Sequence, residues 1–227
     1  MYQYEDGIIS QSGQKYSFHI CMCKKCSFIF LQEAYEDYYE EKFFSVYEKF
    51  DKNNFFSFPN RKEENIKAVE MIQRTLYSVG MPNILEIGSN RGDLLYLLKE
   101  AIPSASVIGI EPAKIDGCTM PTINSFFSIK MFNSKFDCIV LQHVLEHMPN
   151  PMILLEDLRK ILVDGGIVYI EVPDVVYSLE KGIEDFMPEH VSYFSKKTLQ
   201  FILNTVGFEI LEDKSNQYLH FKKKKKE

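Results

Sequence analysis

The sequence has no run of apolar residues close to the ~20 that a membrane-spanning helix needs. Its N-terminus also lacks the basic and then apolar pattern of a secretory signal. The chain holds five cysteines, and their spacing does not form the regular framework of a disulfide-rich secreted domain. These absences predict no membrane span, and they favour a reduced, cytoplasmic location.

An excess of basic residues is missing as well. The chain has 26 Lys and Arg against 32 Asp and Glu, and its net charge is −6. Nucleic-acid-binding proteins normally carry a basic surface, so the balance does not favour a nucleic-acid partner. One basic run, Lys222 to Lys226, follows the last apolar segment. We interpret it as a solvated tail, and contact with an anionic partner is the alternative.

A length of 227 residues favours one domain with an appended lobe. We expect an N-terminal segment (1–60), a main domain (61–223) and a basic tail (224–227). Sixteen of the 31 Phe and Tyr residues lie in the first 60 positions, where the pattern predicts a hairpin (14–31) and one or two helices (33–50). Such a density of rings indicates packing against the main domain, a lid over an acceptor pocket, or both.

The main domain alternates between strand and helix patterns. Predicted strands cover 84–88, 106–111, 119–123, 136–142, 166–172, 208–211 and 218–222, and predicted helices cover 61–78, 92–101, 151–162 and 195–206. Parallel strands need crossover connections, so we expect helices on both faces of one sheet. The last helix and its two strands, which can pair antiparallel, differ from a regular dinucleotide-binding fold.

The segment 83–111 has the pattern of a nucleotide-binding β-α-β unit that ends on an acidic residue. Gly88 and Gly92 form its tight turn. A dinucleotide site would have a third glycine, which lets a pyrophosphate approach the helix N-terminus, but Asn90 stands at that place. The turn therefore indicates a ligand with a ribose and no pyrophosphate, such as S-adenosylmethionine.

Four motifs in this order resemble the class I S-adenosylmethionine-dependent methyltransferases. They are Leu-Glu-Ile-Gly-Ser-Asn-Arg-Gly (85–92), Gly-Ile-Glu-Pro (109–112), the segment 136–148 and Leu-Val-Asp-Gly-Gly-Ile-Val-Tyr-Ile-Glu-Val-Pro (162–173). The resemblance covers roughly residues 60 to 223. It implies an α/β fold with a Rossmann-like, seven-stranded, mostly parallel sheet and an antiparallel edge hairpin, under an aromatic-rich N-terminal helical lid. It also implies S-adenosylhomocysteine as the product.

The resemblance also implies a cofactor site. Glu86 would accept a hydrogen bond from the amino group of the cofactor, Gly88 would allow close backbone approach, and Glu111 would bind both ribose hydroxyls. A solvated strand-end carboxylate is the alternative for Glu111, and a simple loop cap is the alternative for Gln142. The full expected set is Glu86, Gly88, Asn90, Gly92, Glu111, Pro112, Asn124, Ser125 and Gln142.

Three of the five histidines, His143, His147 and His190, follow predicted strands at the carboxyl edge of the sheet, where open α/β folds bind ligands. A neutral imidazole can accept the proton of a hydroxyl group as that group attacks a methyl donor. We therefore take these three histidines as candidate catalytic residues. The segment 189–195 resembles the histidine-bearing stretch of sugar methyltransferases, which implies that His190 is the general base. The alternatives are a histidine that fixes the loop and a metal ligand.

The metal alternative comes from His143-x-x-Glu146-His147. It resembles the Glu-x-x-Glu-His motif of the ubiquinone-pathway and small-RNA 2′-O-methyltransferases, although His143 replaces the first Glu. In those families the motif and a later histidine hold a divalent ion, so the resemblance implies His143, Glu146, His147 and His190 as ligands. We do not favour a metal here, and a turn that shapes the pocket floor is the alternative for Glu146 and His147.

The N-terminal segment contains His19-x-Cys21-x-Cys23-x-x-Cys26. A structural zinc site usually takes two Cys-x-x-Cys pairs, and only Cys23 and Cys26 form one here. The segment resembles the second half of the zinc ribbon of some sugar methyltransferases. We interpret it as a remnant of that ribbon without its metal.

Together these patterns predict an O-methyltransferase that acts on a hydroxyl group of a sugar or surface-glycan precursor, of the capsule or lipopolysaccharide type. One alternative is a metal-assisted O-methyltransferase of another small molecule or of an RNA 2′-hydroxyl. The other is a cofactor-binding module without turnover. The sequence leaves the acceptor and the oligomeric state open.

Overall fold

The computed structural model describes residues 8–9, 15–16, 19–32, 61–115, 117–118, 120–182, 186, 190–212 and 218–223. Its main sheet has seven strands in the order β11-β12-β9-β8-β5-β6-β7. Their bounds are β5 (Asn83–Ile87), β6 (Ser106–Ile110), β7 (Thr122–Ile123), β8 (Phe136–Gln142), β9 (Leu162–Glu171), β11 (Phe208–Glu212) and β12 (Tyr218–Lys223).

Five of these strands, β5 to β9, pair in parallel. Strand β12 pairs antiparallel with both β9 and β11, so the two C-terminal strands form a reversed edge. The prediction of an α/β, Rossmann-like fold with a mostly parallel sheet is therefore confirmed. None of the helices in the described part of the chain is long and apolar enough to cross a membrane.

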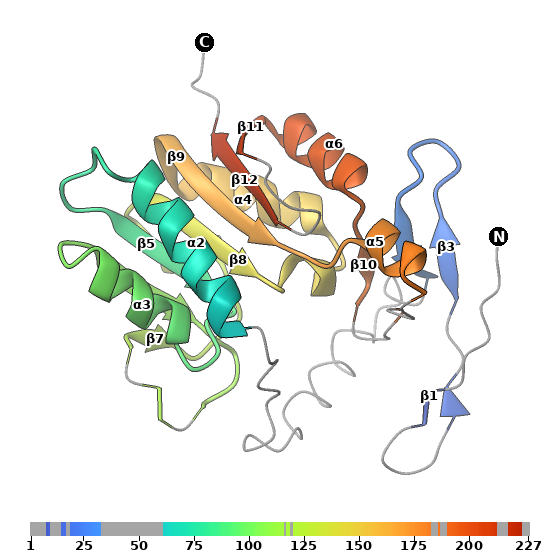
Figure 1. The fold of residues 1–227 in the computed structure, drawn as a ribbon, viewed down its shortest axis with the longest axis horizontal. Coiled ribbons are helices and arrows are strands. Elements are labelled where there is room, and N and C mark those ends of the chain that lie inside the picture. Colours follow the sequence, from blue (N-terminus) through green and yellow to red (C-terminus); the bar gives the residue numbers. More distant parts are fainter. Residues whose placement is uncertain are drawn as a thin grey trace.

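Helices cover both faces of this sheet (Figure 1). On one face, α2 (Arg61–Thr75) and α3 (Asp93–Ala101) bury an apolar cluster that includes Ile72 and Leu98 against β5, β8 and β9. On the other face, α4 (Pro151–Ile161) and α6 (Lys196–Val206) bury the largest cluster, which includes Leu158 and Leu203. Because strand side chains alternate between the faces, the apolar strands supply both clusters.

A second, three-stranded sheet was not predicted. The N-terminal hairpin of β3 (Ile20–Met22) and β4 (Ile29–Leu31) pairs through β4 with β10 (Ser192–Tyr193), in the order β10-β4-β3. A short antiparallel pair, β1 (Ile8–Ile9) and β2 (Lys15–Tyr16), precedes it. The predicted helical lid falls in 33–60, which lies outside the described residues.

Several element boundaries differ from the predictions. Strand β9 begins at Leu162, four residues early, and its register with β8 shifts between Phe136 and Cys138. Gly165, with φ 79°, supplies the left-handed turn within that irregular start. Strand β7 is only two residues long, and α2 ends at Thr75 rather than near 78. A short helix, α5 (Val175–Glu180), lies between the predicted strand 166–172 and the predicted helix 195–206, where no element was predicted.

Candidate active site

The loop between β5 and α3 takes the tight turn that its glycines predict. Gly88, Asn90 and Gly92 all have positive φ angles, of 74°, 48° and 79°. A Cβ atom at Gly88 would lie 2.5 Å from Cγ2 of Val144, so no larger residue fits there without movement. The backbone of this loop can therefore lie close both to a ligand and to the turn that follows β8.

Glu111, directly after β6, is buried and held by this loop. Its Oε2 accepts a hydrogen bond from the backbone N–H of Asn90 (2.9 Å), and its Oε1 accepts one from Ala113 (3.0 Å). Each carboxylate oxygen has a further lone pair, so the fixed carboxylate can still accept two ribose hydroxyls. Nδ2 of Asn124 donates to the carbonyl oxygens of Glu111 (3.3 Å) and Ala113 (3.2 Å), which brings the segment after β7 to the same corner.

Glu86, in β5, has a carboxylate oxygen that lacks a hydrogen-bond partner, and its carboxyl feels the charge of Glu111. It is buried, and its Oε2 has no hydrogen-bond partner among the described residues. Burial in this apolar setting raises the pKa of its carboxyl well above the usual range, although the positive charge of Arg61 acts in the opposite direction. A buried acceptor without a donor is costly, so the site suits a ligand that brings a cationic amino group.

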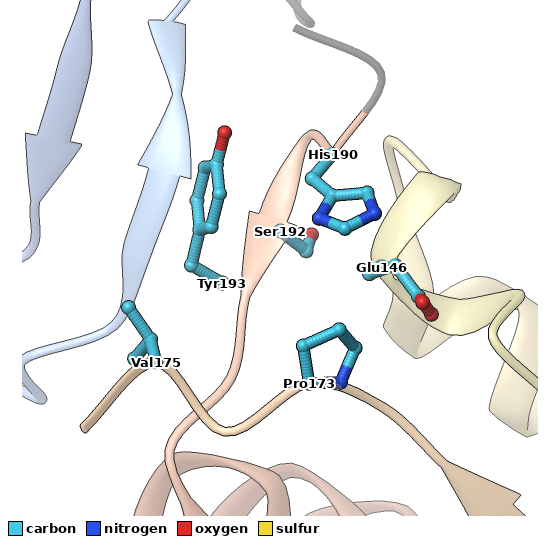
Figure 2. Close-up of a pocket in the computed structure, with 6 residues that line it drawn as sticks. All are labelled: Glu146, Pro173, Val175, His190, Ser192 and Tyr193. Atoms are coloured by element: carbon cyan, nitrogen blue, oxygen red, sulfur yellow. The ribbon is translucent and has the colours of Figure 1, made fainter. Parts of the chain in front are cut away.

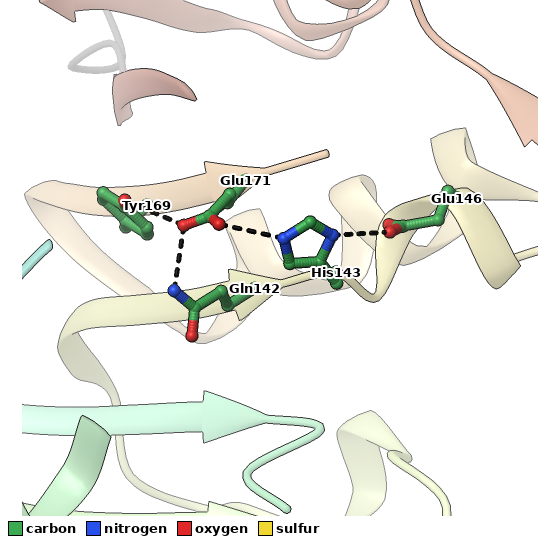
Figure 3. A network of polar contacts seen from close by, with 5 residues as sticks. All are labelled: Gln142, His143, Glu146, Tyr169 and Glu171. Atoms are coloured by element: carbon green, nitrogen blue, oxygen red, sulfur yellow. Dashed lines mark hydrogen bonds and ion pairs between the residues drawn. The ribbon is translucent and has the colours of Figure 1, made fainter. Parts of the chain in front are cut away.

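A polar network joins the ends of β8 and β9 (Figure 3). Glu171 is fully buried, and three donors surround its carboxylate: Nε2 of Gln142 (2.9 Å), the hydroxyl of Tyr169 (3.2 Å) and Nε2 of His143 (2.9 Å). The other ring nitrogen of His143 forms an ion pair with Oε1 of Glu146 (3.3 Å). Two carboxylates therefore bracket one imidazole.

This environment sets the charge of His143. Burial alone would lower its pKa, but the hydrogen bonds and negative charges of Glu146 and Glu171 outweigh burial and raise the pKa of His143 to about 9. At neutral pH the ring is therefore an imidazolium and has no free nitrogen to accept a proton. His143 therefore fits the role of a fixed cation between two carboxylates better than the role of a base. Its positive φ angle of 53° shows that the backbone is constrained here.

The rings of the other two predicted histidines lie next to each other, and one of them, His190, lines a pocket. The short helix η3 (Leu145–His147) and the segment before β10 bring the rings of His147 and His190 to a centroid distance of 4.9 Å. Figure 2 shows the pocket beside them. It is lined by Glu146, Pro173, Val175, His190, Ser192 and Tyr193.

Backbone hydrogen bonds fix His190 in this position. The N–H of Val191 donates to the carbonyl oxygen of Glu146 (2.9 Å), and the N–H of Leu31 in β4 donates to the carbonyl oxygen of Val191 (3.0 Å). Val191 and Tyr193 share an apolar cluster with Leu31. The N-terminal hairpin thus supports the wall that carries His190, which itself is only 7% exposed.

Glu146 lies at the centre of this site and is 1% exposed. Burial would raise the pKa of its carboxyl, but the contact with the imidazolium of His143 outweighs burial, and proximity to the imidazoles of His147 and His190 adds to the effect, so the pKa lies below its ordinary value. The carboxylate is therefore ionised at neutral pH. Neither of its oxygens has a hydrogen-bond partner among the described residues, although Oε1 forms the ion pair with His143.

Two groups of residues in the described part of the chain have the composition of a metal site. One atom each of Glu146, His147 and His190 lie within 4.8 Å of one another, and so do atoms of Glu64, His143 and Glu171. Neither group contains a cysteine. In the N-terminal hairpin, Sγ of Cys21 instead donates to Oε1 of Gln32 (3.5 Å).

The structure brings residues of the two predicted groups together at two corners of the sheet edge and places further polar residues between them. Residues of the expected cofactor set gather where β5, β6 and β7 end, and His143, His147 and His190 gather where β8 ends. Sequence reasoning missed Glu171 and Glu64. Glu171 could have been found because it is an acidic residue at the end of an apolar strand, in the same position as Glu111 after β6. Glu64 is half-buried in the first turn of α2, and no sequence pattern marks it.

Comparison with known proteins assigns this chain to a family. A family model described as a methyltransferase domain matches residues 39–213. A tRNA U34 carboxymethyltransferase from Nautilia profundicola is 26% identical over an alignment of 132 residues, and the match covers 53% of this chain and 42% of that protein. The match therefore spans less than half of that relative's length.

Solved structures share the fold at low sequence identity. A 1,6-didemethyltoxoflavin-N1-methyltransferase from Burkholderia thailandensis, bound to S-adenosylhomocysteine, has a TM-score of 0.59 at 13% identity, with 92% of this chain and 100% of that chain covered. The N-methyltransferase NodS from Bradyrhizobium japonicum, also bound to S-adenosylhomocysteine, has a TM-score of 0.55 at 16% identity, with 82% and 99% covered.

Proposed function

We propose that this chain, which belongs to the methyltransferase-domain family, transfers a methyl group from S-adenosylmethionine to a hydroxyl group of a sugar or surface-glycan precursor, with His190 as the general base. The observation that carries the proposal is the position of His190. It lies nearly buried in a pocket at the carboxyl edge of the sheet, within 4.8 Å of the ionised carboxylate of Glu146.

The residues at the other corner fit S-adenosylmethionine. The unpartnered Oε2 of Glu86 can accept a hydrogen bond from its amino group, the fixed carboxylate of Glu111 can accept both ribose hydroxyls, and Gly88 leaves room for close approach. We assign Asn90, Gly92, Pro112, Asn124, Ser125 and Gln142 to the same site. The bound cofactor supplies a methyl group on a positively charged sulfonium.

In the reaction that we propose, the acceptor oxygen attacks the methyl carbon in line with the breaking C–S bond. An O–C bond forms, the sulfur keeps the electron pair, and S-adenosylhomocysteine leaves. A ring nitrogen of His190 takes the proton of the hydroxyl group, and the carboxylate of Glu146 stabilises the imidazolium that results. Positioning supplies much of the rate in such a displacement, and the hydrogen-bonded wall around His190 provides it.

Release of S-adenosylhomocysteine from a panel of nucleotide sugars tests this function. The substitution His190→Ala is expected to lower turnover by about 100- to 10,000-fold, the usual contribution of a general base, while calorimetry with S-adenosylhomocysteine shows unchanged binding. His19→Ala, a histidine outside the pocket, is the matched control. Unchanged turnover of His190→Ala would reject the assignment of the base.

A second candidate function is a metal-assisted O-methylation, because atoms of Glu146, His147 and His190 lie within 4.8 Å of one another. Mixed carboxylate and imidazole ligands suit Mn²⁺ or Zn²⁺. Loss of turnover with a chelator and its return with Mn²⁺ would favour this candidate. The tRNA-modifying relative makes an RNA acceptor worth including in the same assay, although the net charge of −6 does not favour it.

A further inference from the structure

The carboxylate of Glu146 is only 1% exposed, and neither of its oxygens has a hydrogen-bond partner among the described residues. Oε1 lies 3.3 Å from Nδ1 of His143, which is an ion-pair distance, and Oε2 has no such contact. Leaving a buried charged oxygen unsatisfied costs more than leaving a neutral one unsatisfied. A native protein keeps such an atom where a ligand supplies the missing donor.

A chain of polar contacts holds the carboxylate of Glu146 in place. Glu171 binds His143 twice, because its carboxylate accepts from the ring Nε2 (2.9 Å) and its carbonyl oxygen accepts from the backbone N–H of His143 (2.9 Å). Gln142 and Tyr169 in turn hold the carboxylate of Glu171 (Figure 3). The chain from Tyr169 through Glu171 and His143 to Glu146 therefore fixes one side of the Glu146 carboxylate.

Glu146 also lines the pocket that His190 lines, together with Ser192 and Tyr193 (Figure 2). A carboxylate oxygen of Glu146 and a ring nitrogen of His190 lie within 4.8 Å of each other. Two hydroxyl groups on neighbouring carbon atoms can reach two such atoms with hydrogen bonds of about 2.7–3.0 Å each.

We propose that Glu146 is a second acceptor-binding residue, which accepts a hydrogen bond from a hydroxyl group adjacent to the one that reacts, so that the acceptor is a vicinal diol methylated on one oxygen only. This inference rests on the proposed function, because it takes His190 as the partner of the reacting hydroxyl group. It narrows the substrate class from any hydroxyl compound to one with two neighbouring hydroxyl groups.

The test compares acceptors in matched pairs. S-adenosylhomocysteine release is measured with methyl glycosides of hexoses and with their monodeoxy counterparts, and in parallel with catechol and phenol. For the wild-type protein, the diol of each pair is expected to have the higher kcat/KM, by about 10- to 100-fold, as for a hydrogen bond to a charged group. Glu146→Gln is expected to remove most of this preference, whereas its affinity for S-adenosylhomocysteine stays unchanged and reports that the fold is intact.

A matched control is Glu180→Gln, which removes an exposed carboxylate from α5 and is expected to keep the preference. Equal loss of turnover on diol and monodeoxy acceptors in Glu146→Gln would overturn the proposal, because the carboxylate would then act without contacting the second hydroxyl group. Equal turnover of both members of each pair by the wild-type protein would also overturn it.

Further outcomes separate this inference from the proposed function. If catechol but no glycoside is methylated, with phenol rejected, the sugar assignment fails and the diol site stands. If diol and monodeoxy glycosides are methylated equally, the sugar assignment stands and the diol site fails. Activity that a chelator removes and Mn²⁺ restores would make Glu146 a metal ligand and overturn the proposal, as would an absence of turnover on every pair.

Discussion

The substitution His143→Asn is expected to change how the stability of the protein depends on pH. His143 lies between the carboxylates of Glu146 and Glu171, at 3.3 and 2.9 Å, and these contacts raise its pKa to about 9 from the ordinary 6.5. Asn keeps a residue that tolerates the positive φ angle at this position, but it cannot carry the charge.

The sign follows from proton linkage. Between pH 6.5 and 9 the folded protein keeps the His143 proton and the unfolded chain loses it, so stability falls as pH rises. The contribution is fully present below pH 6.5 and is lost above about pH 9. At 1.36 kcal/mol per tenfold change in the proton equilibrium, this span corresponds to about 3 kcal/mol. Because 31% of the side chain is exposed, water screens part of this energy and about 2 kcal/mol is expected.

Urea unfolding at several pH values between 6.5 and 9 measures the contribution of the charged His143 to the free energy of unfolding. The free energy of unfolding of the wild-type protein should exceed that of His143→Asn most at the low end, and the difference should shrink by about 2 kcal/mol toward pH 9. Titrating groups away from His143, such as Glu86, are present in both proteins and cancel in the difference. Glu171→Gln removes one of the two carboxylates and should make the fall smaller than in the wild type.

Parallel curves of unfolding free energy against pH for the wild type and His143→Asn would refute the assignment of a charged His143. If the difference between wild type and His143→Asn stayed constant from pH 6.5 to 9, then the imidazole would not be held as a cation in the folded state. The bracket of two carboxylates around His143 would then contribute packing and hydrogen bonds only.

Three further predictions concern other parts of the chain. Gly88→Ala places a Cβ atom 2.5 Å from Val144 at a φ of 74°, so S-adenosylhomocysteine binding by calorimetry should weaken at least tenfold, or roughly 1.4 kcal/mol; unchanged affinity would contradict the close approach. Cofactor affinity should rise with pH in the wild type, because the raised pKa of Glu86 keeps it protonated until the ligand arrives, and Glu86→Gln should remove this dependence. Ser195→Ala removes the capping box of α6 and should lower the free energy of unfolding by about 1 kcal/mol; Ser104→Ala, at an exposed turn, is the control.

The cofactor corner could be predicted from sequence because it is local. The strand, turn, helix and second strand of 83–111 are contiguous, and each has its own pattern: an apolar run, two glycines, amphipathic spacing and a terminal acid. The structure has β5, α3 and β6 within a residue or two of the predicted ranges. Long-range contacts were not needed to find these elements.

The pairing of β4 with β10 could not be predicted in this way. The two strands are three and two residues long, too short for a periodic signal, and about 160 positions separate the paired residues Phe30 and Ser192. The early start of β9 has a similar cause. The Val-Asp-Gly-Gly stretch has the pattern of a turn, yet pairing with β8 recruits Leu162 into the strand despite the irregular register.

Glu171 shows why the acceptor corner needed three-dimensional information. Its carboxylate is held by Gln142 from β8, Tyr169 from β9 and His143 after β8, and none of these contacts has a local sequence signature. The pocket beside His190, which we propose binds the acceptor, combines η3, the segment after β9 and β10, and β4 supports it from the N-terminal hairpin. Changes in the hairpin, such as Leu31→Ala, should therefore raise the KM for the acceptor and leave cofactor affinity unchanged. The two corners share one sheet edge but depend on different parts of the chain, so acceptor choice can change in evolution while the cofactor loop stays the same.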